Sequence, residues 1–258
     1  MKKICWITTG GTIASIEGEH GLYASSKGET LYHLLGNMTS QYDITIHDLF
    51  TIDSSNMQPE EWKLIGECVF ERVNDFDGIV ITHGTDTMAY TASALSFMLS
   101  NLNIPVVLTG SQLPLSHPLS DGQENMRLAL AMAASAHPGV FVAFNRKIIL
   151  GARAVKVRTT GFHAFESVNY PYIATVNSLG LQIHEELLPS LHGPCRLIDT
   201  LCEDVFLLKL IPGMNPMIFD MLMHMDIKGV VIEAFGIGGL SYIRRDLTGR
   251  IVDLLDHG

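Results

Sequence analysis

Two short segments rich in threonine and glycine carry residue types that an enzyme could use for nucleophilic chemistry. Thr9-Gly10-Gly11-Thr12-Ile13-Ala14 follows the apolar run 3–8, and His83-Gly84-Thr85-Asp86-Thr87 follows the apolar run 78–82. Paired glycines let the backbone approach a ligand closely, and a threonine hydroxyl becomes a nucleophile when a neighbouring group removes its proton. Parallel strands place their carboxyl ends along one edge of a sheet. The two segments are therefore predicted to face one pocket.

Each of these segments also has a simpler interpretation. Thr12 or Thr85 could cap the helix that follows it, with Asp86 favoured by the helix dipole. His83 could act as a base, although a single histidine at a strand end is more often a hydrogen-bonded structural group. A dinucleotide-binding loop is disfavoured because the first segment lacks the third glycine of Gly-x-Gly-x-x-Gly. The residue types alone leave capping and catalysis open.

Composition restricts the partners of the chain. Its 258 residues are 47% hydrophobic and 17% charged, which suits one large or two moderate cores. A net charge of −10 disfavours nucleic acid, and no apolar run is long enough to span a membrane. The first residues leave no room for a secretory signal, so we expect a cytoplasmic protein. No metal-binding motif of histidines or cysteines is present, so no metal is expected.

The order of strand and helix patterns predicts the fold class. This order is typical of an α/β protein with a doubly wound, mostly parallel sheet. The predicted elements are strands at 4–8, 42–50, 78–82 and 104–109, a hairpin of 140–144 with 147–150, and helices at 59–73, 88–99 and 122–136. Asn56 or Ser55 is expected to cap the first helix, and Asp121 with Glu124 resembles a capping box at the third.

A change in composition divides the chain. The region 182–203 contains Pro189, Gly193 and Pro194, which break the preceding pattern. We therefore expect an N-terminal α/β catalytic domain over 1–185, a linker over 186–203, and a second, smaller α/β domain over 204–258. Strands at 205–210 and 229–234 and a helix at 216–224 make only a thin second domain, so this domain is expected to be incomplete.

Three motifs together resemble the bacterial-type L-asparaginase family. They are the segment 9–14, Asp53-Ser54-Ser55-Asn56-Met57, and the long segment 78–88. The likeness continues through 157–167 into the second domain and covers most of the chain. The segment 90–97 and the short N-terminus are similar to the cytoplasmic type I branch. Asn56 departs from the pattern, because many relatives have aspartate at this position.

The resemblance implies an activity and a set of catalytic residues. Members of this family cleave the side-chain amide of L-asparagine to L-aspartate and ammonia through a threonine acyl-enzyme, without metal or organic cofactor. Thr12 would be the nucleophile, and Tyr23 would stand beside it on a mobile lid. Thr85, Asp86 and Lys156 would form the second catalytic group.

The resemblance also implies how substrate is held and how the chain assembles. Ser54 and Ser55 would bind the carboxylate of asparagine, Asp86 would bind its ammonium group, and Thr85 would share in the substrate site. The glycine- and serine-rich segment 15–29 would be the lid. The family forms homo-oligomers, so a dimer or tetramer is expected.

Three alternatives remain open at this stage. The same site could prefer glutamine, as in a glutaminase-asparaginase. The chain could be an amidotransferase subunit that supplies ammonia for a charged tRNA, although such subunits usually carry an additional N-terminal module. Complete family members continue past Gly258, so the chain could also be a catalytically impaired binder of small amino acids.

Overall fold

The computed structural model describes residues 1–18, 21–24 and 27–257. The chain divides into two compact units, Met1–Asp199 and Thr200–Gly258. The boundary between the units falls inside the predicted linker. No helix in the described part of the chain is long and apolar enough to cross a membrane.

The first unit is built on a sheet of eight strands among the described residues, in the order β13-β12-β9-β8-β7-β5-β1-β4. The strands from β8 to β4 run parallel, whereas β9, β12 and β13 are antiparallel. Their bounds are β1 Lys2–Gly10, β4 Tyr42–Ile52, β5 Gly78–Thr82, β7 Pro105–Thr109, β8 Gly139–Phe144, β9 Lys147–Leu150, β12 Ala174–Asn177 and β13 Gly180–Ile183.

The parallel strands follow the doubly wound order 2-1-3-4-5 when they are numbered along the chain. The direction of winding therefore reverses between β1 and β5, which are paired in register from Ile4 with Gly78 to Thr8 with Thr82. In open α/β sheets a ligand binds at such a switch point, beyond the carboxyl ends of the strands. The fold thus singles out the loops that follow β1 and β5.

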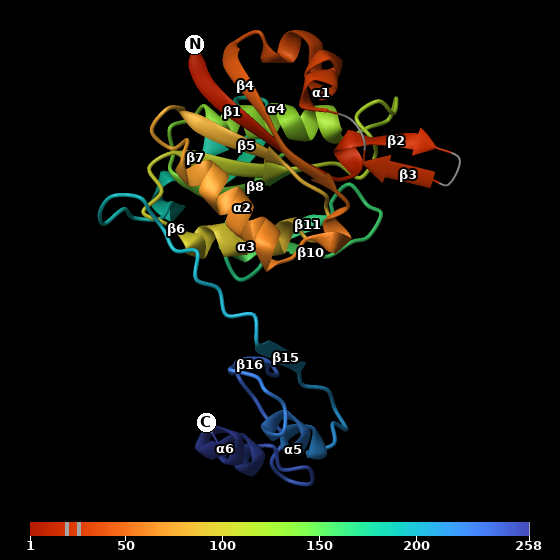
Figure 1. Ribbon diagram of the computed structural model, residues 1–258, viewed down its shortest axis with the longest axis vertical. Helices are drawn as coiled ribbons and strands as arrows, with labels where there is room; N and C mark the ends of the chain where they lie inside the picture. Colours follow the sequence, from red (N-terminus) through yellow and green to blue (C-terminus); the bar gives the residue numbers. More distant parts are fainter. Residues whose placement is uncertain (19–20, 25–26, 258) are drawn as a thin grey trace. The chain divides into compact units, whose positions relative to one another are not determined.

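Helices cover both faces of this sheet (Figure 1). The helices α2 Pro59–Phe70 and α3 Met88–Met98 pack on one face, and α1 Gly28–Leu35 and α4 Gly122–Ala133 pack on the other. Alternate residues of each strand serve the two cores: Cys5 and Ile7 of β1 join the first, and Ile4 and Trp6 join the second. Burial on both faces explains why the central strands are continuous apolar runs.

Short elements complete the two units. In the first unit, β2 Ser15–Gly18 pairs with β3 Gly21–Ala24, β10 Ala154–Lys156 with β11 Phe165–Ser167, and β6 Leu99–Ser100 with β14 Arg196–Leu197. Its 3₁₀ helices are η1 Thr12–Ala14, η2 Gly36–Thr39, η3 Ser54–Asn56, η4 Gly151–Arg153 and η5 Glu185–Leu187. In the second unit, β15 Val205–Lys209 pairs in parallel with β16 Gly229–Glu233, and α5 Met217–Met223 and α6 Thr248–His257 pack against them.

The predicted doubly wound sheet is confirmed, whereas the predicted helix caps are wrong. The helix α2 begins after Gln58, and the Gln58 N–H donates to the Glu61 carboxylate at 2.9 Å in a capping box. Neither Asn56 nor Ser55 fills this place, because both belong to η3. Asp121 precedes α4 without a side-chain cap, since its carboxylate binds backbone N–H groups of the preceding loop instead.

The capping box gives a test of how α2 is held. We expect Glu61→Ala to lower the free energy of unfolding by about 1 kcal/mol, because the Gln58 N–H loses its acceptor. Glu60→Ala removes a neighbouring carboxylate from the same helical turn and controls for the helix dipole. Urea unfolding of both variants checks this expectation. Equal losses in the two variants would show that charge alone matters.

Candidate active site

Four neighbouring strands each end in a loop that carries polar residues. The loop after β1 holds Thr12, the loop after β5 holds Thr85, and the loop after β4 holds Ser54. The strand β7, on the far side of β5 from β1, is followed by Gln112. Because the strands are parallel, all four loops leave the same edge of the sheet.

Backbone contact brings three of these loops together. A Cβ atom added to Gly11 would lie 2.8 Å from the carbonyl carbon of His83, closer than real side chains come. A Cβ added to Gly84 would lie 2.6 Å from the Cβ of Ser54 and 3.2 Å from the Cα of Gly11. Gly11 also has φ +81°, which residues with side chains rarely adopt. Thr12 and Thr85 each follow this contact by one residue.

Thr12 is the first residue of η1 and does not cap it. Gly11 occupies the N-cap position, and no side chain accepts a hydrogen bond there. The loop is held by its backbone, because the Gly11 N–H donates to the Ile52 carbonyl at 3.2 Å. The Thr12 side chain is half-buried, and its hydroxyl makes no hydrogen bond to another described residue. The capping interpretation therefore fails for Thr12.

Thr85, Asp86 and Lys156 form one hydrogen-bonded group. Lys156, at the end of β10, donates from Nζ to Thr85 Oγ1 at 2.8 Å and to Asp86 Oδ1 at 2.7 Å. The Thr85 hydroxyl donates to Gln112 Oε1 at 3.2 Å. Thr85 is buried and does not cap α3, whose N-cap is Thr87. The Lys156 side chain is 16% exposed and that of Asp86 is 63% exposed, so the ion pair lies at the solvent edge of the group.

The serines predicted to bind a carboxylate lie on η3. Ser54 is buried against Gly84, and its carbonyl accepts a hydrogen bond from Thr87 Oγ1 at 2.7 Å. Ser55 is exposed, and its N–H and hydroxyl both donate to Asp53 Oδ1, at 2.8 and 2.7 Å. These two hydrogen bonds, from the backbone first, lower the pKa of Asp53. The Ser55 hydroxyl is therefore occupied by Asp53 in this structure.

His83 is a satisfied structural group. It is fully buried, with Nδ1 2.7 Å from the Gly84 carbonyl and Nε2 2.8 Å from Thr91 Oγ1. The carbonyl can only accept, so Nδ1 carries the proton and Nε2 accepts from Thr91, which in turn accepts from Trp62 Nε1 at 3.0 Å. Burial lowers the pKa of His83 to about 4, which keeps the ring neutral.

The predicted lid has a described backbone in part. Residues 15–18 and 21–24 form the antiparallel pair β2 and β3, in which Tyr23 is opposite Ile16. The side chain of Tyr23 and residues 19–20 and 25–26 lie outside the described part of the structure. The role of Tyr23 and the closing of this segment stay predictions.

Two residues of this region were not anticipated from the sequence. Gln112 contacts Thr85 directly, and Asp53 holds Ser55. The signal for Gln112 was available, because Gly110-Ser111-Gln112 follows a predicted strand as the two threonine segments do. The contact itself could not be predicted without knowing that β7 is the neighbour of β5.

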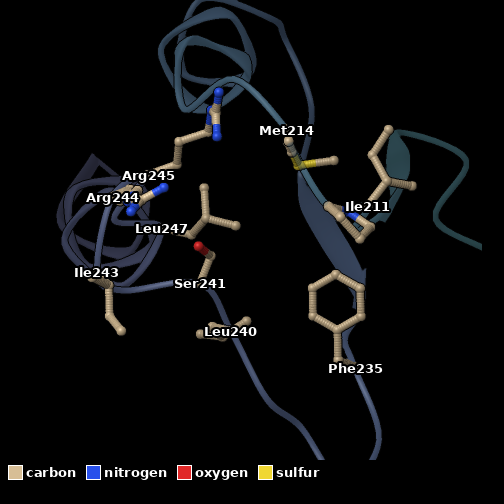
Figure 2. A pocket seen from close by; sticks show the side chains of 11 residues that line it. Ile211, Met214, Phe235, Leu240, Ser241, Ile243, Arg244, Arg245 and Leu247 are labelled. Atoms are coloured by element: carbon tan, nitrogen blue, oxygen red, sulfur yellow. The ribbon is translucent and has the colours of Figure 1, made fainter.

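A cavity in the second unit does not carry comparable groups. It measures about 520 Å³ and is lined mostly by apolar side chains, together with Ser241, Arg244 and Arg245 (Figure 2). Among the described residues that line it there is no threonine, histidine or carboxylate. No group of three or more metal-ligating side chains occurs in the described chain either. The loops after β1, β4, β5 and β7 are the candidate site because they meet through their backbones and carry a hydrogen-bonded group of threonine, carboxylate and lysine.

Comparison with known proteins identifies the family. Residues 3–188 match the family described as "Asparaginase, N-terminal". The chain belongs to the asparaginase family. It is 42% identical to an L-asparaginase of Thermococcus kodakarensis over 95% of this chain and 74% of the relative. It is 38% identical to L-asparaginase 1 of Escherichia coli K12 over 92% of this chain and 72% of the relative.

Solved asparaginases share the fold. The structure of the thermostable L-asparaginase from Thermococcus kodakarensis superposes with a TM-score of 0.90 at 40% identity, covering 98% of this chain and 77% of that protein. A probable cytoplasmic L-asparaginase from Campylobacter jejuni superposes with a TM-score of 0.83 at 25% identity, covering 99% of this chain and 80% of that protein. The recognition made from the three sequence motifs is confirmed.

The buried histidine of this asparaginase-family chain predicts a pH dependence of stability. The unfolded chain takes up a proton near pH 6.5, whereas folded His83 does so only at about pH 4. Stability contributed by neutral His83 is therefore present above pH 6.5 and lost as the pH falls toward 4. From pH 7.5 to pH 5 we expect this residue to lower the free energy of unfolding by roughly 2 kcal/mol.

Urea unfolding at the two pH values, on wild type and His83→Gln, isolates this contribution. The variant has no titrating ring, so its free energy of unfolding should fall less than that of wild type. His33→Gln removes an exposed histidine and serves as the matched control. An identical pH dependence in wild type and His83→Gln would contradict the assignment of a buried, neutral ring.

Proposed function

We propose that this chain hydrolyses the side-chain amide of L-asparagine to L-aspartate and ammonia. The observation that carries the proposal is the contact of Gly11 with Gly84, which places the Thr12 loop against the loop of Thr85. Lys156 and Asp86 extend this arrangement through hydrogen bonds. Membership of the asparaginase family and the names of its relatives support the same activity.

Thr12 is proposed as the nucleophile. Its Oγ1 attacks the amide carbon while its proton leaves to a basic group, and the carbon–nitrogen bond then breaks as the nitrogen takes up a proton and departs as ammonia. The product of this step is an ester between Thr12 and the aspartyl group. A water molecule adds to the ester carbon, the bond to Thr12 breaks, and the proton of the water returns to Thr12 Oγ1. Tyr23 is proposed to assist beside Thr12.

Thr85, Asp86 and Lys156 are proposed to act on the protons of this reaction and to hold the substrate. Lys156 donates a hydrogen bond to Thr85 Oγ1 and so helps to hold this hydroxyl in place. Asp86, largely exposed, offers an anionic group for the ammonium of asparagine. Ser54 and Ser55 are proposed to bind the substrate carboxylate, which requires the Ser55 hydroxyl to turn away from Asp53.

We further propose that the chain acts as a homo-oligomer in the cytoplasm. The cytoplasmic assignment is supported by the likeness to the Campylobacter jejuni protein, which is described as a probable cytoplasmic L-asparaginase. Size-exclusion chromatography with light scattering tests the assembly, and a monomer at micromolar concentration contradicts it.

The catalytic roles predict a graded loss of activity. Thr12→Ala removes the nucleophile and should lower kcat for asparagine by roughly 10³-fold or more. Lys156→Met removes the hydrogen bond to Thr85 and should lower kcat by about 10²-fold. Ammonia release over a range of asparagine concentrations measures kcat and KM. Thr30→Ala, on the exposed side of α1, is the matched control and should match wild type.

The same assay separates the proposed function from its alternatives. Wild type should release ammonia faster from asparagine than from glutamine at equal concentration, and the reverse would favour a glutaminase. Aspartate binding without ammonia release from either amide would indicate a binding protein. Retention of more than a tenth of wild-type kcat in Thr12→Ala would remove this threonine from the mechanism.

A further inference from the structure

Gln112 joins the Thr85 hydroxyl to a separate part of the chain. Its Oε1 accepts from Thr85 Oγ1 at 3.2 Å. Its Nε2 donates to the carbonyls of Thr159 and Gly161 at 3.0 and 3.1 Å. One side chain thus links the loop after β5 to the segment 157–164, which connects β10 and β11.

These contacts fix which way the amide of Gln112 faces. Both Nε2 hydrogens are used by carbonyl oxygens, which can only accept. Turning the amide by half a turn would place Oε1 against two carbonyl oxygens and Nε2 against Thr85. Both hydrogen bonds to Thr159 and Gly161 would be lost. The carbonyls therefore hold Oε1, an acceptor, toward Thr85.

The backbone of Gln112 is held from the opposite side. Its N–H donates to both oxygens of Asp121, at 3.0 and 3.2 Å, and the Leu113 N–H donates to the same carboxylate at 3.3 Å. Asn125 Nδ2 donates to Asp121 and to the Gly110 carbonyl, both at 3.0 Å. Gln112 is thus fixed at its main chain and at the end of its side chain.

A fixed acceptor determines the direction of the Thr85 hydroxyl. A threonine hydroxyl has one hydrogen and two lone pairs. The hydrogen points to Gln112, and Lys156 Nζ donates to one lone pair at 2.8 Å. Among the described contacts of Thr85 Oγ1 only one lone pair is left. That lone pair can accept a hydrogen bond from an attacking hydroxyl or water. The amide of Gln112 is neutral and too weak a base to take up the proton of the Thr85 hydroxyl.

We propose that Gln112 is a positioning residue of the reaction, which turns the Thr85 hydroxyl so that its remaining lone pair is available to the proton of the attacking group. This role rests on the proposed amidohydrolase function. It acts through Thr85, because no hydrogen bond joins the Gln112 side chain to the other described residues of the site except through that hydroxyl.

The test compares three variants with wild type in the asparagine assay. Gln112→Met keeps the length of the side chain but removes the acceptor and both donors. We expect its kcat to fall roughly 10- to 100-fold, with KM within threefold of wild type. Gln112→Glu keeps the acceptor and, when protonated, one donor. Near neutral pH its carboxylate can still accept from Thr85 but cannot donate to the two carbonyls that hold it, so its kcat should lie between those of Gln112→Met and wild type, more than threefold below wild type.

Arg158→Met separates positioning from simple tethering of the segment. Arg158 Nη1 donates to the His163 carbonyl at 2.7 Å and contacts Glu166 at 3.3 Å, so it holds the same segment without touching Thr85. Its kcat should stay within threefold of wild type. Thermal unfolding of every variant verifies that it is folded.

Each outcome decides the question. A Gln112→Met variant within threefold of wild-type kcat overturns the inference, as does an Arg158→Met variant that is equally slow. If Gln112→Met does not fold, Gln112→Glu decides, and a kcat within threefold of wild type overturns the inference. If wild type itself releases no ammonia, the proposed function fails and this inference fails with it.

Discussion

The site depends on a contact in which three loops meet through atoms that leave no room for a side chain. Gly11 lies against His83 and Gly84, and Gly84 lies against Ser54. The sheet order prepares this contact, because the winding reverses between β1 and β5 and brings their loops to one edge. Because this packed backbone is stiff, Thr12 and Thr85, which follow the contact, are held in fixed positions. Charged side chains then need only to complete a geometry that the main chain has already set.

The polar groups around the contact are of two kinds: neutral groups joined by hydrogen bonds beneath it, and an ion pair at the solvent edge. His83 and Thr91, which are buried, and Trp62, which is partly buried, form a chain of hydrogen bonds in which every ring nitrogen has a partner. The pair of Lys156 with Asp86 reaches the solvent, where an ion pair contributes little to stability. The main contribution of this ion pair is therefore to fix the direction of the hydrogen bonds that Lys156 donates. The buried ring of His83 and the exposed carboxylate of Asp86 thus have different environments although they are close in the sequence.

Most of the fold could be predicted from the sequence, and part of the site could not. Continuous apolar runs such as Gly78–Thr82 identified the central strands, because burial on both faces requires them. Local rules failed at the helix ends, where Asp121 serves the loop of Gln112 instead of capping α4. Tertiary contacts decide whether Asp121 caps the helix or binds the loop, and these contacts cannot be read from a short stretch of sequence. The part played by Tyr23 stays a prediction for a different reason, because its side chain lies outside the described residues.

Threonine itself contributes to the order of this arrangement. Its branched Cβ restricts rotation about χ1, so the hydroxyl of Thr85 has few positions, and Gln112 and Lys156 select among them. A serine in the same place would retain the hydroxyl but gain rotational freedom, and the direction of its lone pairs would be less well defined. Preorganised groups act on developing charge without reorganising during the reaction. The stiff side chain, the oriented amide of Gln112 and the hydrogen bond from Lys156 Nζ together fix the direction of the Thr85 hydroxyl.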